Sequence, residues 1–182
     1  MLTLPTYITI FRFLAGLMMI IAYAFLANPF LAIFILFLLG AVTDWIDGFL
    51  ARKMNLHSRF GAFLDPVADK YLVAVSLILL NAHFQHKILT VATMLIITRE
   101  ILMSSLRHLA SDLNVGHRVN VNKFGKIKTA VQLISIGALL ADAAIIMPLS
   151  LYTFAEIGVM IAAILSWTSF VSYYRSISSY LS

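Results

Sequence analysis

Long apolar runs separated by short polar links make up most of this chain, and they restrict the folds open to it. Of its 182 residues, 62% are hydrophobic and only 12% are charged. A soluble domain of this length would need far more polar surface to cover its core. Because one membrane crossing takes about 20 residues, the apolar sequence suffices for about six spans. We therefore expect an all-α integral membrane protein with six transmembrane helices, folded as a single membrane-embedded domain over residues 1–182.

Turn signals and polar stretches divide the apolar sequence into segments. The expected segments are residues 1–26, 30–42 with a continuation into the next polar run, 61–80, 88–110, 129–147 and 151–174. The breaks are the turn at Asn28–Pro29, a basic loop over Arg52–Phe60, a polar link over Asn81–Lys87, the polar region Ser111–Lys128 and a stop at Pro148. Pro66 is expected to loosen or kink the first turns of the third segment. The first segment has neither a positively charged leader nor a small-residue cleavage site, so we expect it to be retained.

Lys and Arg residues are divided unevenly between the two sides that alternating loops define. One side holds the cations of the two long polar regions and Arg175, whereas the other keeps only Lys87. Loops rich in Lys and Arg stay in the cytoplasm. We therefore expect both termini on the cytoplasmic side, with Trp167, Tyr173 and Tyr174 in the interfacial belt of the last helix.

Four of the eight acidic residues lie within one run of 26 residues. Asp44 and Asp47 share one face of a helix by their spacing, and Asp65 and Asp69 share a face of the next helix. If the polar stretch between them is a hairpin-like loop, the two faces meet and the four carboxylates point at a common centre. Such a cluster of like charges is costly unless a cation neutralises it. Oxygen ligands without Cys or His point to Mg²⁺ or Mn²⁺, as one ion or two.

Small residues and an arginine accompany these carboxylates. Gly48, Ala51 and Gly61 lie on the carboxylate faces, where they leave room for a ligand to approach the backbone. Arg52, in phase with Asp44 and Gly48, is suited to a phosphate. Together with a metal ion, this set indicates a pyrophosphate or nucleotide site. The alternative, a set of surface carboxylates in a loop, is disfavoured because the residues between them are apolar.

The run resembles the signature of the CDP-alcohol phosphotransferase family. The matching residues are Asp44, Asp47, Gly48, Ala51, Arg52, Gly61, Asp65 and Asp69, with Pro5, Thr9 and Arg12 near the amino terminus. The resemblance extends over essentially the whole chain, and it is strongest with bacterial members that use glycerol 3-phosphate, through stretches such as Thr-Arg-Glu-Ile and Gly-Lys-Ile-Lys-Thr. Members often carry Asn where this chain has Thr6, whose hydroxyl can still donate and accept a hydrogen bond.

This resemblance implies a catalytic domain that transfers the phosphatidyl group of CDP-diacylglycerol to sn-glycerol 3-phosphate, giving phosphatidylglycerol phosphate and CMP. Asp44, Asp47, Asp65 and Asp69 would hold two Mg²⁺ or Mn²⁺ ions, with Asp69 also the general base. The residues expected to contact CDP-diacylglycerol are Thr6, Thr9, Asp44, Gly48, Ala51, Arg52, Ser58 and Gly61. The resemblance further implies a homodimer in the bacterial inner membrane, surrounded by membrane lipids, with a cytoplasmic active site and no nucleic acid partner.

Other ionisable residues allow more than one interpretation. Arg99 and Glu100 either serve the reaction directly or belong to an interhelical polar network. The acceptor phosphate is assigned to basic residues near the cytoplasmic interface, although attraction of anionic headgroups accounts for part of that charge. These residues are Arg107, Arg118, Lys126 and Lys128. On the far side, His83 and His86 are expected to be solvated, and Asp142 and Glu156 to be exposed or interfacial.

Alternative functions are open at this point. Within the family, the acceptor could instead be inositol phosphate, serine or a second lipid, because the carboxylate run is shared. A divalent-cation transporter would need acidic residues at several depths, whereas only Asp142 and Glu156 fall in the outer half. A structural membrane subunit would leave the carboxylates unexplained.

Overall fold

The computed structural model describes residues 4–54, 59–113, 124–145 and 149–178. Within its helices, the description excludes the side chains of residues 4–5, 44–54, 59–63, 65, 124–126, 145 and 149–150. The described ranges contain helices and short turns and no strand. The prediction of an all-α protein is therefore confirmed for the described residues.

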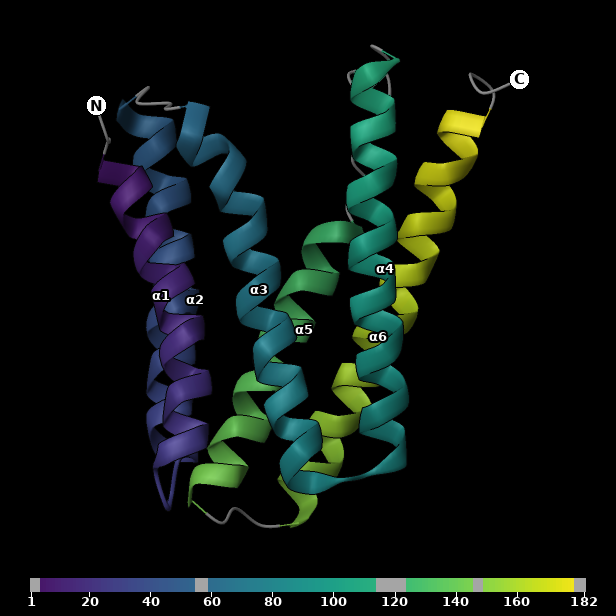
Figure 1. The fold of residues 1–182 in the computed structure, drawn as a ribbon. Helices are drawn as coiled ribbons and strands as arrows, with labels where there is room; N and C mark the ends of the chain where they lie inside the picture. Colours follow the sequence, from purple (N-terminus) through teal and green to yellow (C-terminus); the bar gives the residue numbers. More distant parts are fainter. Residues whose placement is uncertain (1–3, 55–58, 114–123, 146–148, 179–182) are drawn as a thin grey trace.

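Six helices make up the described chain, in the order that the sequence predicts (Figure 1). They are α1 (Leu4–Phe25), α2 (Phe30–Met54), α3 (Arg59–Phe84), α4 (Lys87–Asp112), α5 (Phe124–Ile145) and α6 (Leu149–Ser178). Three predicted connections were too long, since residues 52–54, 59–60, 81–84 and 124–128 are helical. Basic side chains such as those of Arg52 and Lys128 are good helix formers, so their charge does not end a helix. Likewise, α3 continues through Pro66.

Within the residues that the structure describes, five helices are long and apolar enough to cross a membrane. These spans are Thr6–Phe25, Pro66–Phe84, Lys87–Asp112, Ile127–Ala144 and Leu151–Ser178. The sixth helix, α2, has 25 residues, and the part of it whose side chains are described, Phe30–Thr43, is apolar as well. It runs beside α1 along most of its length (Figure 1). The chain is thus an integral membrane bundle of long apolar helices.

The helices are arranged so that the two halves of the carboxylate run share one end of the bundle. The start of α1, the end of α2, the start of α3 and the end of α6 lie at this end, which we call the motif end (Figure 1). Between the α1–α2 pair and the α4–α6 pair lie α3 and α5 (Figure 1). A continuous apolar core joins all six helices, with Met19, Phe37, Leu80, Ile96 and Leu139 among its fully buried members. This core forms the other half of the bundle and holds the motif end in place.

Two glycines allow α3 to approach its neighbours closely. An added Cβ at Gly16 of α1 would overlap the ring of Tyr71, and one at Gly40 of α2 would overlap Leu72. Both partners lie on α3, two and three residues after Asp69. Small residues at such positions are typical of membrane helix interfaces, where close packing replaces the hydrophobic effect. The carboxylate-bearing turn of α3 is therefore packed tightly against α1 and α2.

The α3–α4 connection consists of Gln85 and His86. Gln85 has φ 49°, in the left-handed region that reverses the chain direction. Asn81 stays within α3 because its amide is satisfied there: Nδ2 donates to Thr93 Oγ1 at 2.6 Å, and Oδ1 accepts from Thr90 Oγ1 at 2.8 Å. These side-chain bonds to α4 explain why a polar stretch that suggested a loop is helical instead.

Glu156 was expected to be exposed or interfacial, and exposure is wrong, since its side chain is only 5% exposed. Its carboxylate accepts a hydrogen bond from the backbone N–H of Leu89 at 3.2 Å and also bonds to the half-exposed His86 ring. The first N–H groups of a helix have no partner within it. Glu156 of α6 therefore caps the start of α4 from a neighbouring helix. Asp142, the other acidic residue at this end, is partly buried, and His83 is exposed as expected.

Removing this cap should destabilise the bundle. We expect Glu156→Ala to lower the free energy of unfolding by about 1–3 kcal/mol, the usual cost of a buried donor left without its partner. Glu156→Gln should cost less, because the amide oxygen can still accept from Leu89. The comparison is made by thermal unfolding of the purified protein in detergent. Equal stability of wild type and Glu156→Ala would mean that the cap contributes nothing.

Candidate active site

The carboxylate run lies on the two helices that meet at the motif end. Residues 44–52 occupy the last turns of α2, and residues 61–69 occupy the first turns of α3. The two helices pack against each other and are joined by residues 55–58 alone, so they run antiparallel and bring the halves of the run together. The side chains of Asp44, Asp47, Gly48, Ala51, Arg52, Gly61 and Asp65 lie outside the described part, as does the whole of Ser58. Asp69 is the predicted metal ligand whose carboxylate is described.

Asp69 forms an ion pair with Arg12 of α1. The Arg12 side chain is only 1% exposed, whereas that of Asp69 is 48% exposed. A buried cation in a membrane span requires an anionic partner, because an uncompensated charge there is costly. Thr6 and Thr9, which precede Arg12 at three-residue spacing, are also buried. One face of α1 is thus a buried polar stripe of Thr6, Thr9 and Arg12, and its last member is bound to Asp69 of α3.

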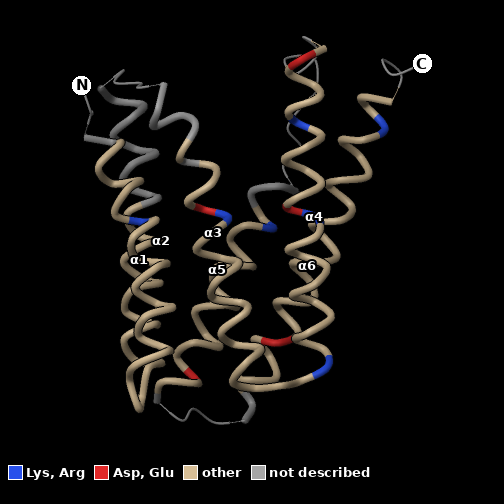
Figure 2. Tube along the Cα trace, viewed as in Figure 1, with Lys and Arg blue, Asp and Glu red and all other residues tan. Residues whose placement is uncertain are grey.

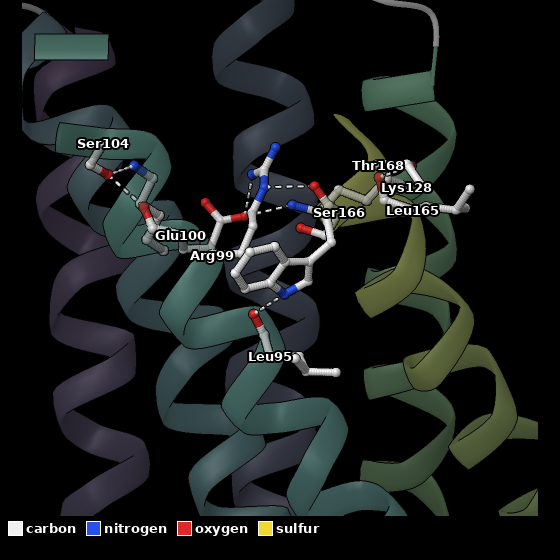
Figure 3. Close-up of polar contacts among 10 residues, drawn as sticks. Leu95, Arg99, Glu100, Ser104, Lys128, Leu165, Ser166 and Thr168 are labelled. Carbon is white, nitrogen blue, oxygen red and sulfur yellow. Dashed lines mark hydrogen bonds and ion pairs between the residues drawn. The ribbon is translucent and has the colours of Figure 1, made fainter. Parts of the chain in front are cut away.

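Lys70, the next residue of α3, points to a different neighbour. Its Nζ bonds to Ser104 Oγ on α4, and Ser104 Oγ in turn donates to the backbone oxygen of Glu100 at 2.8 Å (Figure 3). The two adjacent residues Asp69 and Lys70 therefore connect α3 to helices on opposite sides. This geometry fixes the position of the turn that carries Asp69.

Arg99 and Glu100 form the interhelical polar network that was one interpretation of their sequence (Figure 3). Arg99 donates to Glu100 Oε1 at 2.9 Å and, through Nε, to the backbone oxygen of Ser166 on α6 at 2.9 Å. Lys128 of α5 donates to the same Glu100 oxygen at 2.5 Å. Arg99 and Lys128 are almost fully buried, with side chains 7% and 8% exposed. One carboxylate thus holds cations from two helices and links α4, α5 and α6.

Charged residues of α1, α3, α4 and α5 lie at one level of the bundle (Figure 2). Lys70, Arg99 and Lys128 all act electrostatically on Glu100. Arg107, one of the predicted phosphate ligands, is exposed and lies close enough to act on Lys70 and Lys128. Among the side chains that the structure describes, cations therefore outnumber anions in this group, which suits it to an anionic ligand.

The structure places the predicted acceptor residues differently from one another. Arg107 is exposed near the group just described, while Lys128 is buried and bound to Glu100. Lys126 lies in the first turn of α5 with its side chain outside the description, and Arg118 lies outside the described residues. Phosphate binding by these four residues stays a prediction. Phosphate binding by Lys128 would require that the phosphate and Glu100 share its ammonium group.

The donor set fits a hard divalent cation. Among the residues whose side chains are described, no group of three or more His, Cys, Asp or Glu could hold a metal ion. Of the four predicted ligands only Asp69 belongs to that part of the chain, and it lies on the same helical face of α3 as Asp65. All four are carboxylates, which suit Mg²⁺ or Mn²⁺. Asp44, Asp47, Asp65 and Asp69 are thus the residues that could hold such an ion.

Sequence reasoning missed two contacts of the Asp69–Lys70 turn. Arg12 was identified only as part of an amino-terminal pattern, and its bond to Asp69 joins residues 57 positions apart. An arginine inside an apolar span and in phase with Thr9 was the available signal, because such a charge needs a partner. Lys70 gave no signal of its own, since it follows the carboxylate run directly.

Removal of the Glu100 charge should destabilise the bundle. We expect Glu100→Gln to lower the free energy of unfolding by about 3 kcal/mol, because Arg99 and Lys128 are left buried without an anion. Chemical unfolding in detergent measures the change. The control is the double variant Glu100→Gln/Lys128→Met, which removes one buried cation and should recover part of the loss. If the double variant is no more stable than Glu100→Gln, Lys128 is not held by this charge.

Comparisons with known proteins cover most of the chain. The family model for CDP-alcohol phosphatidyltransferase matches residues 2–173. A Wigglesworthia glossinidia brevipalpis protein is 36% identical over 177 residues, which cover 95% of this chain and 93% of that protein. An Escherichia coli K12 protein is 42% identical over 139 residues, 75% of this chain and 76% of its own length. A Haemophilus influenzae protein is 40% identical over 139 residues, 75% of each chain. All three are named CDP-diacylglycerol–glycerol-3-phosphate 3-phosphatidyltransferase.

Proposed function

The chain belongs to the CDP-alcohol phosphatidyltransferase family, and we propose that it transfers the phosphatidyl group of CDP-diacylglycerol to sn-glycerol 3-phosphate. The products are phosphatidylglycerol phosphate, a phospholipid precursor, and CMP. The names of the relatives support this choice of acceptor. The observation in the structure that supports it is the turn of α3 at the end of the carboxylate run, where Asp69 is bound to Arg12 of α1 and Lys70 to Ser104 of α4.

A divalent cation, Mg²⁺ or Mn²⁺, would neutralise the diphosphate of CDP-diacylglycerol and stabilise the departing CMP. We assign Asp44, Asp47 and Asp65 as ligands of one ion, with Asp69 reaching a second. The family signature and the all-oxygen donor set support this assignment. Without the positive charge of the metal ions, four carboxylates at the edge of a membrane would repel one another.

The nucleotide end of CDP-diacylglycerol is assigned to the turns beside the carboxylates. Gly48, Ala51 and Gly61 leave space for it next to the backbone, and Arg52 offers a guanidinium to a phosphate oxygen. Thr6, Thr9 and Ser58 complete the proposed contacts. The buried polar stripe of α1, which holds both threonines and ends at Arg12, supports a polar pocket beside α3.

Asp69 is proposed as the general base. The primary hydroxyl of glycerol 3-phosphate gives its proton to the Asp69 carboxylate while its oxygen attacks the lipid-linked phosphorus. The bond from phosphorus to the CMP oxygen breaks as the new bond forms. Arg12, bound to Asp69, holds the carboxylate in position for that hydroxyl. Arg107, Arg118, Lys126 and Lys128 are proposed to bind the phosphate of the acceptor.

The location of the site suits substrates of opposite character. The acyl chains of CDP-diacylglycerol stay in lipid, while the nucleotide and the acceptor reach the motif end from water. We propose that this end faces the cytoplasm of a bacterial cell, because the basic residues gather there. We also propose, on the family resemblance, that the chain is a homodimer in the inner membrane.

The proposed function is tested by incorporation of radiolabelled sn-glycerol 3-phosphate into lipid by the purified protein in detergent. Product should form with CDP-diacylglycerol and Mg²⁺, and chelation by EDTA should stop it reversibly. Labelled inositol phosphate and serine, supplied in parallel, should give no lipid product. Asp44→Asn, Asp47→Asn and Asp65→Asn should each abolish turnover and weaken the binding of Mn²⁺. Full activity in excess EDTA would refute the metal assignment, and labelled product from another acceptor would refute the choice of substrate.

A double-mutant cycle tests whether Arg12 acts through Asp69. Asp69→Asn should lower kcat by about 10²–10⁴, the usual worth of a general base, while CDP-diacylglycerol and Mn²⁺ still bind. Arg12→Gln should also lower kcat with little change in KM, but it should have no further effect when added to Asp69→Asn, because the base that it positions is already lost.

Arg99→Gln is the matched control for this cycle, since Arg99 is also buried and ion-paired but bonds to Glu100 rather than Asp69. Its effect should persist in the Asp69→Asn background. Arg12→Lys, which keeps the charge, should restore part of the activity that Arg12→Gln loses. Additive effects of Arg12→Gln and Asp69→Asn would show that Arg12 serves the fold alone.

A further inference from the structure

A groove of about 800 Å³ runs along the exposed side of α6, beside α4. Its lining residues recur at three- and four-residue spacing, so they form one face of α6 together with one residue of α4. They are Leu95 of α4 and Ile164, Trp167, Thr168, Val171, Ser172, Arg175 and Ser176 of α6. Its volume lies within the range of about 300–1,000 Å³ that is usual for small-molecule sites. None of these residues belongs to the carboxylate run or to the proposed acceptor site.

The groove changes character along α6. Toward the middle of the bundle it is lined by apolar side chains, of which Ile164 is 55% and Val171 is 41% exposed. Toward the motif end the lining becomes polar, with Ser172 and Ser176, and it ends at Arg175 in the last turns of the helix. An apolar stretch that leads to hydroxyls and then to a cation matches an amphiphile with an acyl chain and an anionic head.

Trp167 gives the groove a fixed wall. Its indole N–H donates to the backbone oxygen of Leu95 on α4 at 3.1 Å, and its ring packs edge-on against Phe170 with 5.6 Å between centroids. The neighbouring residue, Ser166, accepts the hydrogen bond of Arg99. The wall is therefore tied to α4 at two successive residues. A groove with a braced wall offers the same shape to every ligand, which lowers the cost of binding.

Arg175 is the charged end of this groove. The ion pairs found among the described residues join other cations, and none of them involves Arg175. Its side chain is exposed near the end of α6. A cation at this depth attracts the anionic headgroups of membrane lipids, at about 1 kcal/mol for each Lys or Arg. Charge therefore selects which lipid the groove prefers.

We propose that this groove binds an anionic phospholipid of the surrounding membrane, with one acyl chain along Ile164 and Val171 and its phosphate at Arg175. The headgroup oxygens also meet the hydroxyls of Ser172 and Ser176. This site is separate from the proposed catalytic one and does not depend on it. A zwitterionic phospholipid carries the same acyl chains but gains less from Arg175, so it binds less tightly.

Trp167 is itself the reporter for the test. The chain has two tryptophans, and Trp45→Phe leaves Trp167 alone. The purified full-length protein with this change is placed in phosphatidylcholine vesicles that contain a small fraction of a lipid with brominated acyl chains, which quenches nearby indoles. Brominated phosphatidylglycerol and brominated phosphatidylcholine are compared at equal mole fraction. Because the preference comes from one cation, the affinity for phosphatidylglycerol should be about fivefold higher than that for phosphatidylcholine.

Two further variants locate the source of that preference. Arg175→Gln should abolish it, so that both brominated lipids quench Trp167 equally. Lys87→Gln, the matched control, removes a cation from the opposite end of the bundle and should leave the preference unchanged. Equal quenching in the parent protein, or a preference that survives Arg175→Gln, would overturn the proposal. So would the absence of quenching by either lipid, which would mean that a second copy of the chain or another protein segment covers the groove.

Discussion

The burial of cations inside an apolar bundle governs the organisation of this protein. Arg12, Arg99 and Lys128 have almost no contact with solvent, and each is bound to a carboxylate. An unpaired charge within a membrane has a high free-energy cost, and a carboxylate held next to each cation offsets that cost. Since the partners lie on other helices, the ion pairs also determine which helices meet. Asp69 joins α3 to α1, and Glu100 joins α4 to α5.

These buried ion pairs lie at one level of the bundle (Figure 2) and separate it into two parts with different roles. On one side lies the apolar core, which includes Phe37, Leu80 and Leu139. On the other lies the motif end, where the last turns of α2 and the first turns of α3 carry the carboxylate run. A reaction between a lipid-linked diphosphate and a soluble phosphate needs such a boundary, because one substrate stays in the bilayer and the other in water.

The contacts around Asp69 hold its carboxylate in a fixed position. Its neighbour Lys70 is bound to Ser104 of α4, while Asp69 itself is bound to Arg12 of α1. Two bonds in opposite directions hold the same turn of α3, which is also packed closely against Gly16 and Gly40. Preorganisation of this kind would lower the cost of placing Asp69, the proposed base, beside its substrate.

The sequence alone determined the class of fold, the six helices, the candidate residues and the family, because each depends on local signals: apolar length, helical spacing and a motif within 26 residues. It misjudged Asn81 and Glu156, whose polarity suggested exposure although both side chains have partners on other helices. It also left open whether Arg99 and Glu100 form a network, and it did not pair Arg12 with Asp69. Only the tertiary structure decided these points, since the partner of a buried charge can lie 57 residues away and spacing along one helix does not reveal it.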